Sequence, residues 1–238
     1  MLLKLYALHG FLGRPQDWEE ILPSHQSTIT IDPYAITLPG PQCCQNNWAA
    51  KFNAQITRNN SQPKPILMGY SMGGRLAMHA LLQAPEKWAG AVIISAHPGL
   101  PNSQEREKRF LHDCAWADRF AHEDWTILMR DWNAQSTFIF DDDIVRHEKD
   151  YSRKICSDTL RYWSLGRQAL LIEKISQLPM PILWIAGEKD APYVAMAKKM
   201  SFAHHQSQVW IAPEVGHRVP WACKNLFQKK LQEFLNKI

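Results

Sequence analysis

The chain has 238 residues, of which 45 % are hydrophobic and 21 % charged, as is typical of a folded globular protein. Its formal net charge of +4 is too small to indicate nucleic acid or an anionic membrane as a partner. The 5 cysteines show no metal-ligand spacing, so we expect no metal, no cofactor and reduced thiols in a cytoplasmic protein. The length fits one large domain that carries an insertion.

The chain starts with the apolar sequence MLLKLYAL, which lacks the basic region and the cleavage site of a signal peptide. We therefore interpret it as the first strand of the fold. No stretch approaches the roughly 18 uninterrupted apolar residues that a membrane-spanning helix needs. We expect a soluble protein that exists as a monomer or a small homo-oligomer.

Short apolar runs that end in turn residues alternate with stretches of helical periodicity. This alternation predicts an α/β fold with a mostly parallel twisted sheet that helices cover on both faces. In such a sheet the ligand site lies at the carboxyl ends of the strands. The predicted strands are 2–8, 27–31, 65–68, 91–95, 181–186 and 208–211, and predicted helices include 75–83, 191–202 and 221–238.

The alternation stops between residues 98 and 177, where the sequence is charged, rich in tryptophan and helical in pattern. We interpret residues 98–177 as a helical cap insertion, and residues 1–97 and 178–238 as the core that carries it. A satellite bundle of helices without a role in binding is the alternative for the inserted segment.

The sequence GYSMG at 69–73 fits the G-x-S-x-G pattern of a nucleophile elbow. Its glycines permit a cramped turn from strand to helix, from which the hydroxyl of Ser71 projects above the sheet. An apolar strand precedes the pattern and an alanine- and leucine-rich helix follows it, as the elbow requires. A turn with a purely structural role is the alternative.

A serine needs a base to accept its proton, and the base needs an acid to orient it. On this fold the order along the chain is serine, acid and histidine. Asp190 and His217 each follow a predicted strand in that order, and they are our candidates for acid and base. Glu188, only two residues before Asp190, is the alternative acid.

The sequence HGFLG at 9–13 follows the first predicted strand. Its glycine lets the backbone N–H of Phe11 turn toward the serine, where the N–H of Met72 also points at a helix start. Two such donors predict an oxyanion hole, the site that stabilises developing negative charge.

The segments HGFLG, GYSMGGR, GEKD and GHR together resemble the α/β-hydrolase fold across essentially the whole chain. A closer resemblance is to the family of 2-succinyl-6-hydroxy-2,4-cyclohexadiene-1-carboxylate (SHCHC) synthases of menaquinone biosynthesis. In that family GYS-x-GGR precedes a strand, an HPGL segment and a helix of the pattern E/R-x-x-R-x-x-x-D-x-x-W-x-x-RF. The residues of this chain that match the helix are Arg106, Arg109, Asp113, Trp116, Arg119 and Phe120.

The resemblance implies an enzyme that eliminates pyruvate from a multiply carboxylated cyclohexene, a small anionic substrate, to form a diene. It implies that Ser71, deprotonated by His217, acts as the base. Arg75 lies one helical turn after Ser71, so its guanidinium can pair with a substrate carboxylate. By the resemblance, the other substrate-binding residues are Arg109, Tyr70, Trp132 and a third cap arginine, for which Arg153 is our candidate.

Two hypotheses from other classes stay open. One is a serine carboxylesterase or thioesterase that uses the same triad on small carboxylated esters, with water as the final acceptor. The other is a binding protein that keeps the fold without turnover. The chain also departs from the family at 32–42, where DPYAITLPGPQ replaces the usual DLPGHG, so we expect a reshaped loop beside the site.

Overall fold

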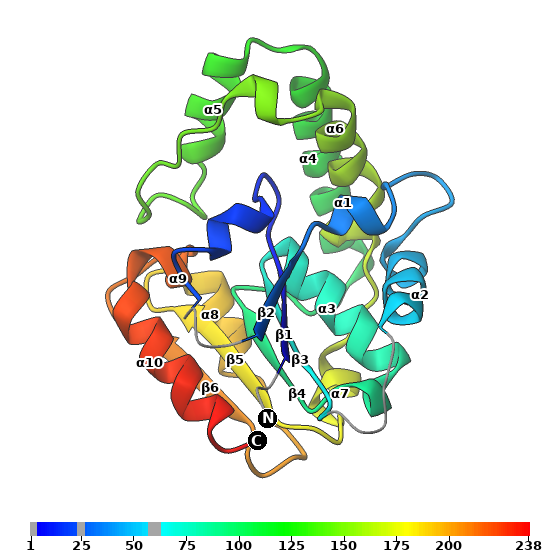
Figure 1. Ribbon diagram of the computed structural model, residues 1–238. Coiled ribbons are helices and arrows are strands. Elements are labelled where there is room, and N and C mark those ends of the chain that lie inside the picture. Colours follow the sequence, from blue (N-terminus) through cyan, green and yellow to red (C-terminus); the bar gives the residue numbers. More distant parts are fainter. Residues whose placement is uncertain (1–3, 23–26, 57–62) are drawn as a thin grey trace.

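The computed structural model describes residues 4–22, 27–56 and 63–238. In this part of the chain, six strands form one sheet in the order β2-β1-β3-β4-β5-β6, and every neighbouring pair is parallel (Figure 1). The predicted α/β fold is therefore confirmed. Residues 2 and 3 of the first predicted strand lie outside the described residues. The strands are β1 (Lys4–Leu8), β2 (Ser27–Ile31), β3 (Ile66–Tyr70), β4 (Gly90–Ile94), β5 (Ile182–Gly187) and β6 (Gln208–Ala212).

The strands form where continuous apolar runs occur in the sequence. Every residue of β3, β4 and β5 is buried, because these central strands have helices on both faces. The edge strands β2 and β6 are only partly buried and contain more polar residues. Each observed strand begins and ends within two residues of its prediction.

Helices cover the two faces of the sheet in two layers. The apolar side of α10 packs on one face together with the 3₁₀ helix η1. The other face packs against α2, α3, α7 and α8. These elements are η1 (Pro15–Trp18), α2 (Gln45–Gln55), α3 (Met72–Gln83), α7 (Ile172–Ser176), α8 (Ala191–Ala197) and α10 (Lys224–Leu235).

Two predicted helices differ from those observed. The predicted helix 221–238 is two helices, α9 (Val219–Ala222) and α10, because the backbone of Cys223 leaves the helical region at φ −136° and ψ 52°. The predicted helix 191–202 ends at Ala197 in α8. The apolar periodicity that predicted both continues past the observed breaks, so it could not locate them.

Residues 98–177 are called the cap segment here. Helices α4, α5 and α6 of this segment lie above the carboxyl ends of the strands, whereas α7 at its end packs on a face of the sheet (Figure 1). The three longer helices enclose a separate apolar cluster that packs on Phe11 and Leu12 of the core. The exact division between core and cap stays a prediction. The helices of the cap segment, besides α7, are α4 (Ser103–His122), α5 (Trp125–Asn133), η3 (Glu148–Asp150), α6 (Arg153–Tyr162) and η4 (Leu165–Arg167); η2 (Pro85–Lys87) precedes β4.

The unusual loop at 32–42 contains a short helix, α1 (Pro33–Ile36), which Asp32 caps by accepting a hydrogen bond from the Tyr34 N–H. The ring of Tyr34 stacks on Trp163 of the cap segment with the centroids 5.9 Å apart. The loop is thus packed between the sheet and the cap segment.

Candidate active site

Ser71 lies in a sharp turn between β3 and α3, with φ 51° and ψ −113°. Few residues other than glycine adopt such a backbone conformation. A Cβ on Gly69 would collide with the carbonyl of Gly73, and a Cβ on Gly73 would lie 2.5 Å from the carbonyl oxygens of Leu8 and His9. The turn therefore needs glycine at both positions, as the G-x-S-x-G pattern requires.

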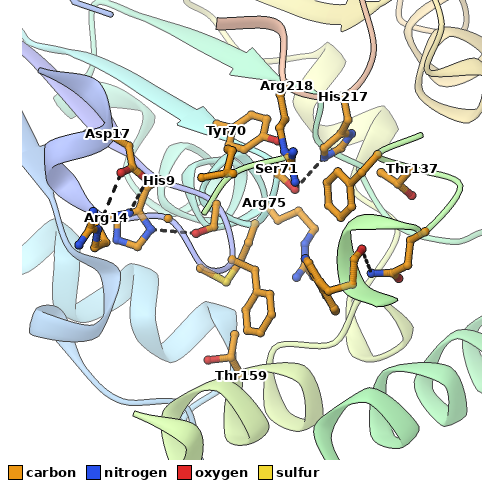
Figure 2. A pocket seen from close by; sticks show the side chains of 18 of the residues that line it. His9, Arg14, Asp17, Tyr70, Ser71, Arg75, Thr137, Thr159, His217 and Arg218 are labelled. Atoms are coloured by element: carbon orange, nitrogen blue, oxygen red, sulfur yellow. Dashed lines mark hydrogen bonds and ion pairs between the residues drawn. The ribbon is translucent and has the colours of Figure 1, made fainter. Parts of the chain in front are cut away.

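The structure brings the three predicted members of the triad together. His217 Nε2 lies 3.1 Å from Ser71 Oγ (Figure 2), and His217 Nδ1 lies 2.6 Å from Asp190 Oδ2. Asp190 follows β5 and His217 follows β6, so neighbouring parallel strands deliver both side chains to one edge of the sheet. This geometry allows His217 to accept the serine proton while Asp190 orients the imidazole.

Glu188, the alternative acid, lies elsewhere. Its carboxylate accepts a hydrogen bond from the backbone N–H of Glu214, and its side chain is exposed. Asp190 is buried against His217 instead. The geometry therefore favours Asp190 as the acid.

The predicted oxyanion-hole residues, Phe11 and Met72, both line the cavity that contains Ser71. Met72 is the first residue of α3, where backbone N–H groups have no partner within the helix. Phe11 lies in a tight turn that Gly13 closes by donating a hydrogen bond to the Gly10 carbonyl over 3.0 Å. Their role in stabilising negative charge stays a prediction.

The cavity has a volume of about 560 Å³ and lies between the sheet and the cap segment. Arg75 extends into it between Ser71 and Thr159 (Figure 2). The guanidinium donates to two uncharged acceptors, Trp163 O at 2.7 Å and Gln168 Oε1 at 3.3 Å. Burial, and then the nearby charge of Arg109, lowers the pKa of Arg75 to about 10.

Arg109 also lines the cavity, where a carboxylate already holds it. Its Nε donates to Asp113 Oδ1 over 2.8 Å, and Ser164 donates to the other oxygen of Asp113 over 2.7 Å. Asp113 is buried, whereas the side chain of Arg109 is 41 % exposed toward the cavity and solvent. Asp113 thus fixes the Nε of Arg109, while the side chain stays partly open to the cavity.

Tyr70 and Trp132 both line the cavity. Tyr70 packs against His217 with ring centroids 5.5 Å apart, and burial raises the pKa of its phenol. Trp132 packs 5.0 Å from Phe11, so it links the cap segment to the predicted oxyanion loop. Their role in substrate binding stays a prediction.

The structure corrects the prediction for Arg153. Its guanidinium donates to Glu148 over 2.6 Å and to the carbonyl oxygens of Phe120 and Glu123, outside the residues that line the cavity. Arg153 is the first residue of α6, and its side chain links the C-terminal end of α4 to Glu148 of η3. Its position therefore suits a structural role.

Arg146 and Arg218 are cavity residues that the sequence analysis did not single out. The Nε of Arg146 donates to the Leu12 carbonyl over 3.1 Å. Arg218 follows His217 in the sequence GHR, a signal that could have identified it. The sequence around Arg146 has no motif or periodicity that could have identified it as a cavity residue, because it lies in an irregular loop.

Tyr193 is a third cavity residue that the sequence analysis did not single out. Its ring centroid lies 4.7 Å from that of His217.

Within the described ranges 4–22, 27–56 and 63–238, no group of three or more His, Cys, Asp or Glu side chains is arranged to bind a metal ion. In the same part of the chain no helix is both long and apolar enough to cross a membrane.

A parallel sheet whose strand ends present a serine elbow, then an acid, then a histidine defines the α/β-hydrolase fold. A family model described as "Serine aminopeptidase, S33" matches residues 48–220, more than half of the chain. The chain therefore belongs to this family of α/β-hydrolases.

The chain is 29 % identical over 244 residues to the SHCHC synthase of Serratia proteamaculans, which covers 97 % of this chain and 92 % of that protein. It is 30 % identical over 217 residues to the SHCHC synthase of Salmonella arizonae, which covers 84 % and 83 %. These relatives confirm the resemblance to that family.

A solved structure described as MenH from S. aureus superimposes with a TM-score of 0.86 at 21 % identity, over 99 % of this chain and 94 % of the other. At that identity the likeness supports the shared fold.

Proposed function

We propose that this protein is an SHCHC synthase, a lyase that eliminates pyruvate from a carboxylated cyclohexene in menaquinone biosynthesis. The relatives that carry this name cover 97 % and 84 % of the chain. The observation that carries the proposal is the environment of Arg75. Among the described residues no carboxylate pairs with this guanidinium, which lies one helical turn from Ser71. A partly buried cation with uncharged partners favours an anionic ligand beside the serine.

In the proposed reaction Ser71 gives its proton to His217, and the imidazolium is stabilised by Asp190. The serine oxygen then removes a proton from a ring carbon of the substrate. The electron pair of that C–H bond forms the new C=C bond, and the C–O bond to the enolpyruvyl group breaks. The departing group takes the bonding electrons and, once protonated, leaves as pyruvate.

Negative charge grows on the substrate as the proton leaves, and the N–H groups of Phe11 and Met72 are our candidates to stabilise it. Both residues line the cavity at Ser71, and Met72 is at the start of a helix, where the helix dipole also favours an anion. Donors that are already in place stabilise this charge without reorganisation during the reaction.

We propose that Arg75 and Arg109 bind substrate carboxylates, and that Tyr70 and Trp132 shape the apolar part of the cavity. Arg146 is our candidate for the third arginine in place of Arg153, because it lines the cavity. We further propose a cytoplasmic enzyme in which residues 98–177 form the cap over a core made of residues 1–97 and 178–238.

A second candidate is a serine carboxylesterase or thioesterase for small carboxylated esters. The strained elbow and the 3.1 Å contact between Ser71 and His217 favour it, since acyl transfer needs an activated serine in such a turn. Arg75 would bind the carboxylate of either substrate.

An assay of pyruvate release decides between the two. The purified protein is incubated with the enolpyruvyl cyclohexene substrate of SHCHC synthases, and separately with a panel of short carboxylated esters. We expect pyruvate release with the former at a rate far above that of any ester, and none above background in Ser71→Ala. Ester hydrolysis without pyruvate release would establish the second candidate.

A further inference from the structure

The loop that carries His217 is bonded to the cap segment through one carboxylate. Asp141 Oδ2 accepts a hydrogen bond from the backbone N–H of His217 over 3.0 Å. Asp141 Oδ1 accepts one from the N–H of Arg218, also over 3.0 Å. Two consecutive backbone donors thus share one carboxylate, although 76 residues separate His217 from Asp141. Hydrogen bonds to a carboxylate are stronger than those between neutral groups, and two consecutive ones restrain this loop.

The glycine before the histidine makes this approach possible. A Cβ on Gly216 would lie 2.8 Å from Asp141 Oδ1 and 3.0 Å from its Oδ2, too close for either oxygen to stay in place. A side chain at position 216 would therefore displace the Asp141 carboxylate from its present place.

The side chain of Arg218 strengthens the same connection. Its guanidinium donates to the Asp142 carbonyl and, over 3.0 Å, to Asn133 Oδ1, and it lies 4.6 Å above the ring of Phe138. Phe138 in turn packs edge-on against the imidazole of His217, with centroids 5.6 Å apart. Cap residues therefore contact both the backbone and the ring of His217.

We propose that Asp141 is a positioning residue, which holds the His217 loop so that the imidazole faces Ser71. This inference rests on the proposed role of His217 as the base for Ser71. The carboxylate touches neither the serine nor a reacting atom, and it acts through the backbone of the histidine. Because Asp141 belongs to the cap segment, the alignment of base and serine then depends on how the cap is seated.

The test measures how fast a small fluorophosphonate modifies Ser71, a reaction that needs the aligned histidine but no substrate. We expect Asp141→Ala and Asp141→Asn to label about 10- to 100-fold more slowly than wild type, because a displacement near 1 Å costs about that much. Asp143→Asn is the matched control, since Asp143 is an exposed acid in the same loop, and it should label at the wild-type rate.

Thermal unfolding of each variant confirms that labelling is measured on folded protein, and Asp141→Asn decides the question if Asp141→Ala does not fold. In turnover assays a positioning role lowers kcat and leaves KM within about 2-fold, whereas a loosened cap alone would raise KM. Wild-type labelling rates in both Asp141 variants would overturn the inference. If the wild-type protein is labelled but releases no pyruvate, the proposed function is refuted and the role of Asp141 is not. If the wild-type protein is not labelled, both the proposed function and the role of Asp141 are refuted.

Discussion

His217 Nδ1 lies 2.6 Å from Asp190 Oδ2, and both side chains are only 2 % exposed. A carboxylate in this position fixes the proton on Nδ1, so that Nε2 presents a lone pair to the Ser71 hydroxyl. Water that competes for either group is excluded by the burial. The pairing therefore sets both the orientation and the proton-accepting nitrogen of the candidate base.

Replacing the acid tests this arrangement. Asp190→Asn should lower kcat about 10³- to 10⁴-fold, because the amide favours the wrong tautomer of His217. Glu188→Gln is the matched control and should stay within about 2-fold of wild type, since the side chain is exposed and bonded to the Glu214 N–H. Steady-state pyruvate release measures both variants. A larger loss in Glu188→Gln than in Asp190→Asn would reverse the assignment of the acid.

The two arginines Arg75 and Arg153 should respond differently to removal. Arg75→Ala should raise KM about 10- to 100-fold, the equivalent of one lost charge-assisted hydrogen-bonded pair. Arg153→Ala should leave KM unchanged and lower the melting temperature, because it loses its bonds to Glu148 and to two helix-end carbonyls. Substrate titration and thermal unfolding of both variants make the comparison. An unchanged KM in Arg75→Ala would contradict its proposed role in binding.

The contrast between these residues shows how far the sequence could predict the site. Ser71, Asp190 and His217 each follow an apolar strand, and a parallel sheet brings strand ends to one edge whatever the loops do. Arg146 and Asp141 lie in the irregular stretch between α5 and α6, where no periodicity fixes the direction of a side chain. Arg153 is a candidate only by the resemblance and by its place in the cap segment, and these do not determine whether a residue at a helix start faces a cavity.

The elbow should be intolerant of even one methyl group. In Gly73→Ala the new Cβ would meet the carbonyl oxygens of Leu8 and His9 at 2.5 Å, and these belong to the backbone of the sheet and of the predicted oxyanion loop. We expect a loss of about 3 kcal/mol or more in the free energy of unfolding, as for severe steric overlap in a core. Gly40→Ala, whose Cβ meets no atom within 4 Å, should change stability by less than about 0.5 kcal/mol. Urea unfolding followed by fluorescence compares the two, and similar midpoints would contradict the proposed close packing.

Acid should destabilise the fold through His79, a buried histidine of α3. Burial, and then the charge of Arg75, lowers the pKa of His79 from its ordinary value of 6.5 to about 4. The unfolded chain therefore binds a proton below pH 6.5 that the folded chain binds only near pH 4. His79 therefore leaves the free energy of unfolding undiminished above pH 6.5. As the pH falls from 6.5 to about 4, protonation of the unfolded chain lowers that free energy by up to about 3 kcal/mol.

His79→Asn removes the titrating ring and keeps a polar group near Asn46, whose Oδ1 lies 2.7 Å from His79 Nδ1. Between pH 7.5 and pH 5 the variant should lose about 2 kcal/mol less of its free energy of unfolding than wild type does. His122→Asn, at an exposed position on α4, should follow the wild-type dependence. Urea unfolding at the two pH values measures all three proteins. If His79→Asn and wild type lose equal stability on acidification, the imidazole of His79 accepts its proton as readily in the folded chain as in the unfolded one, and the acid sensitivity of the fold has another origin.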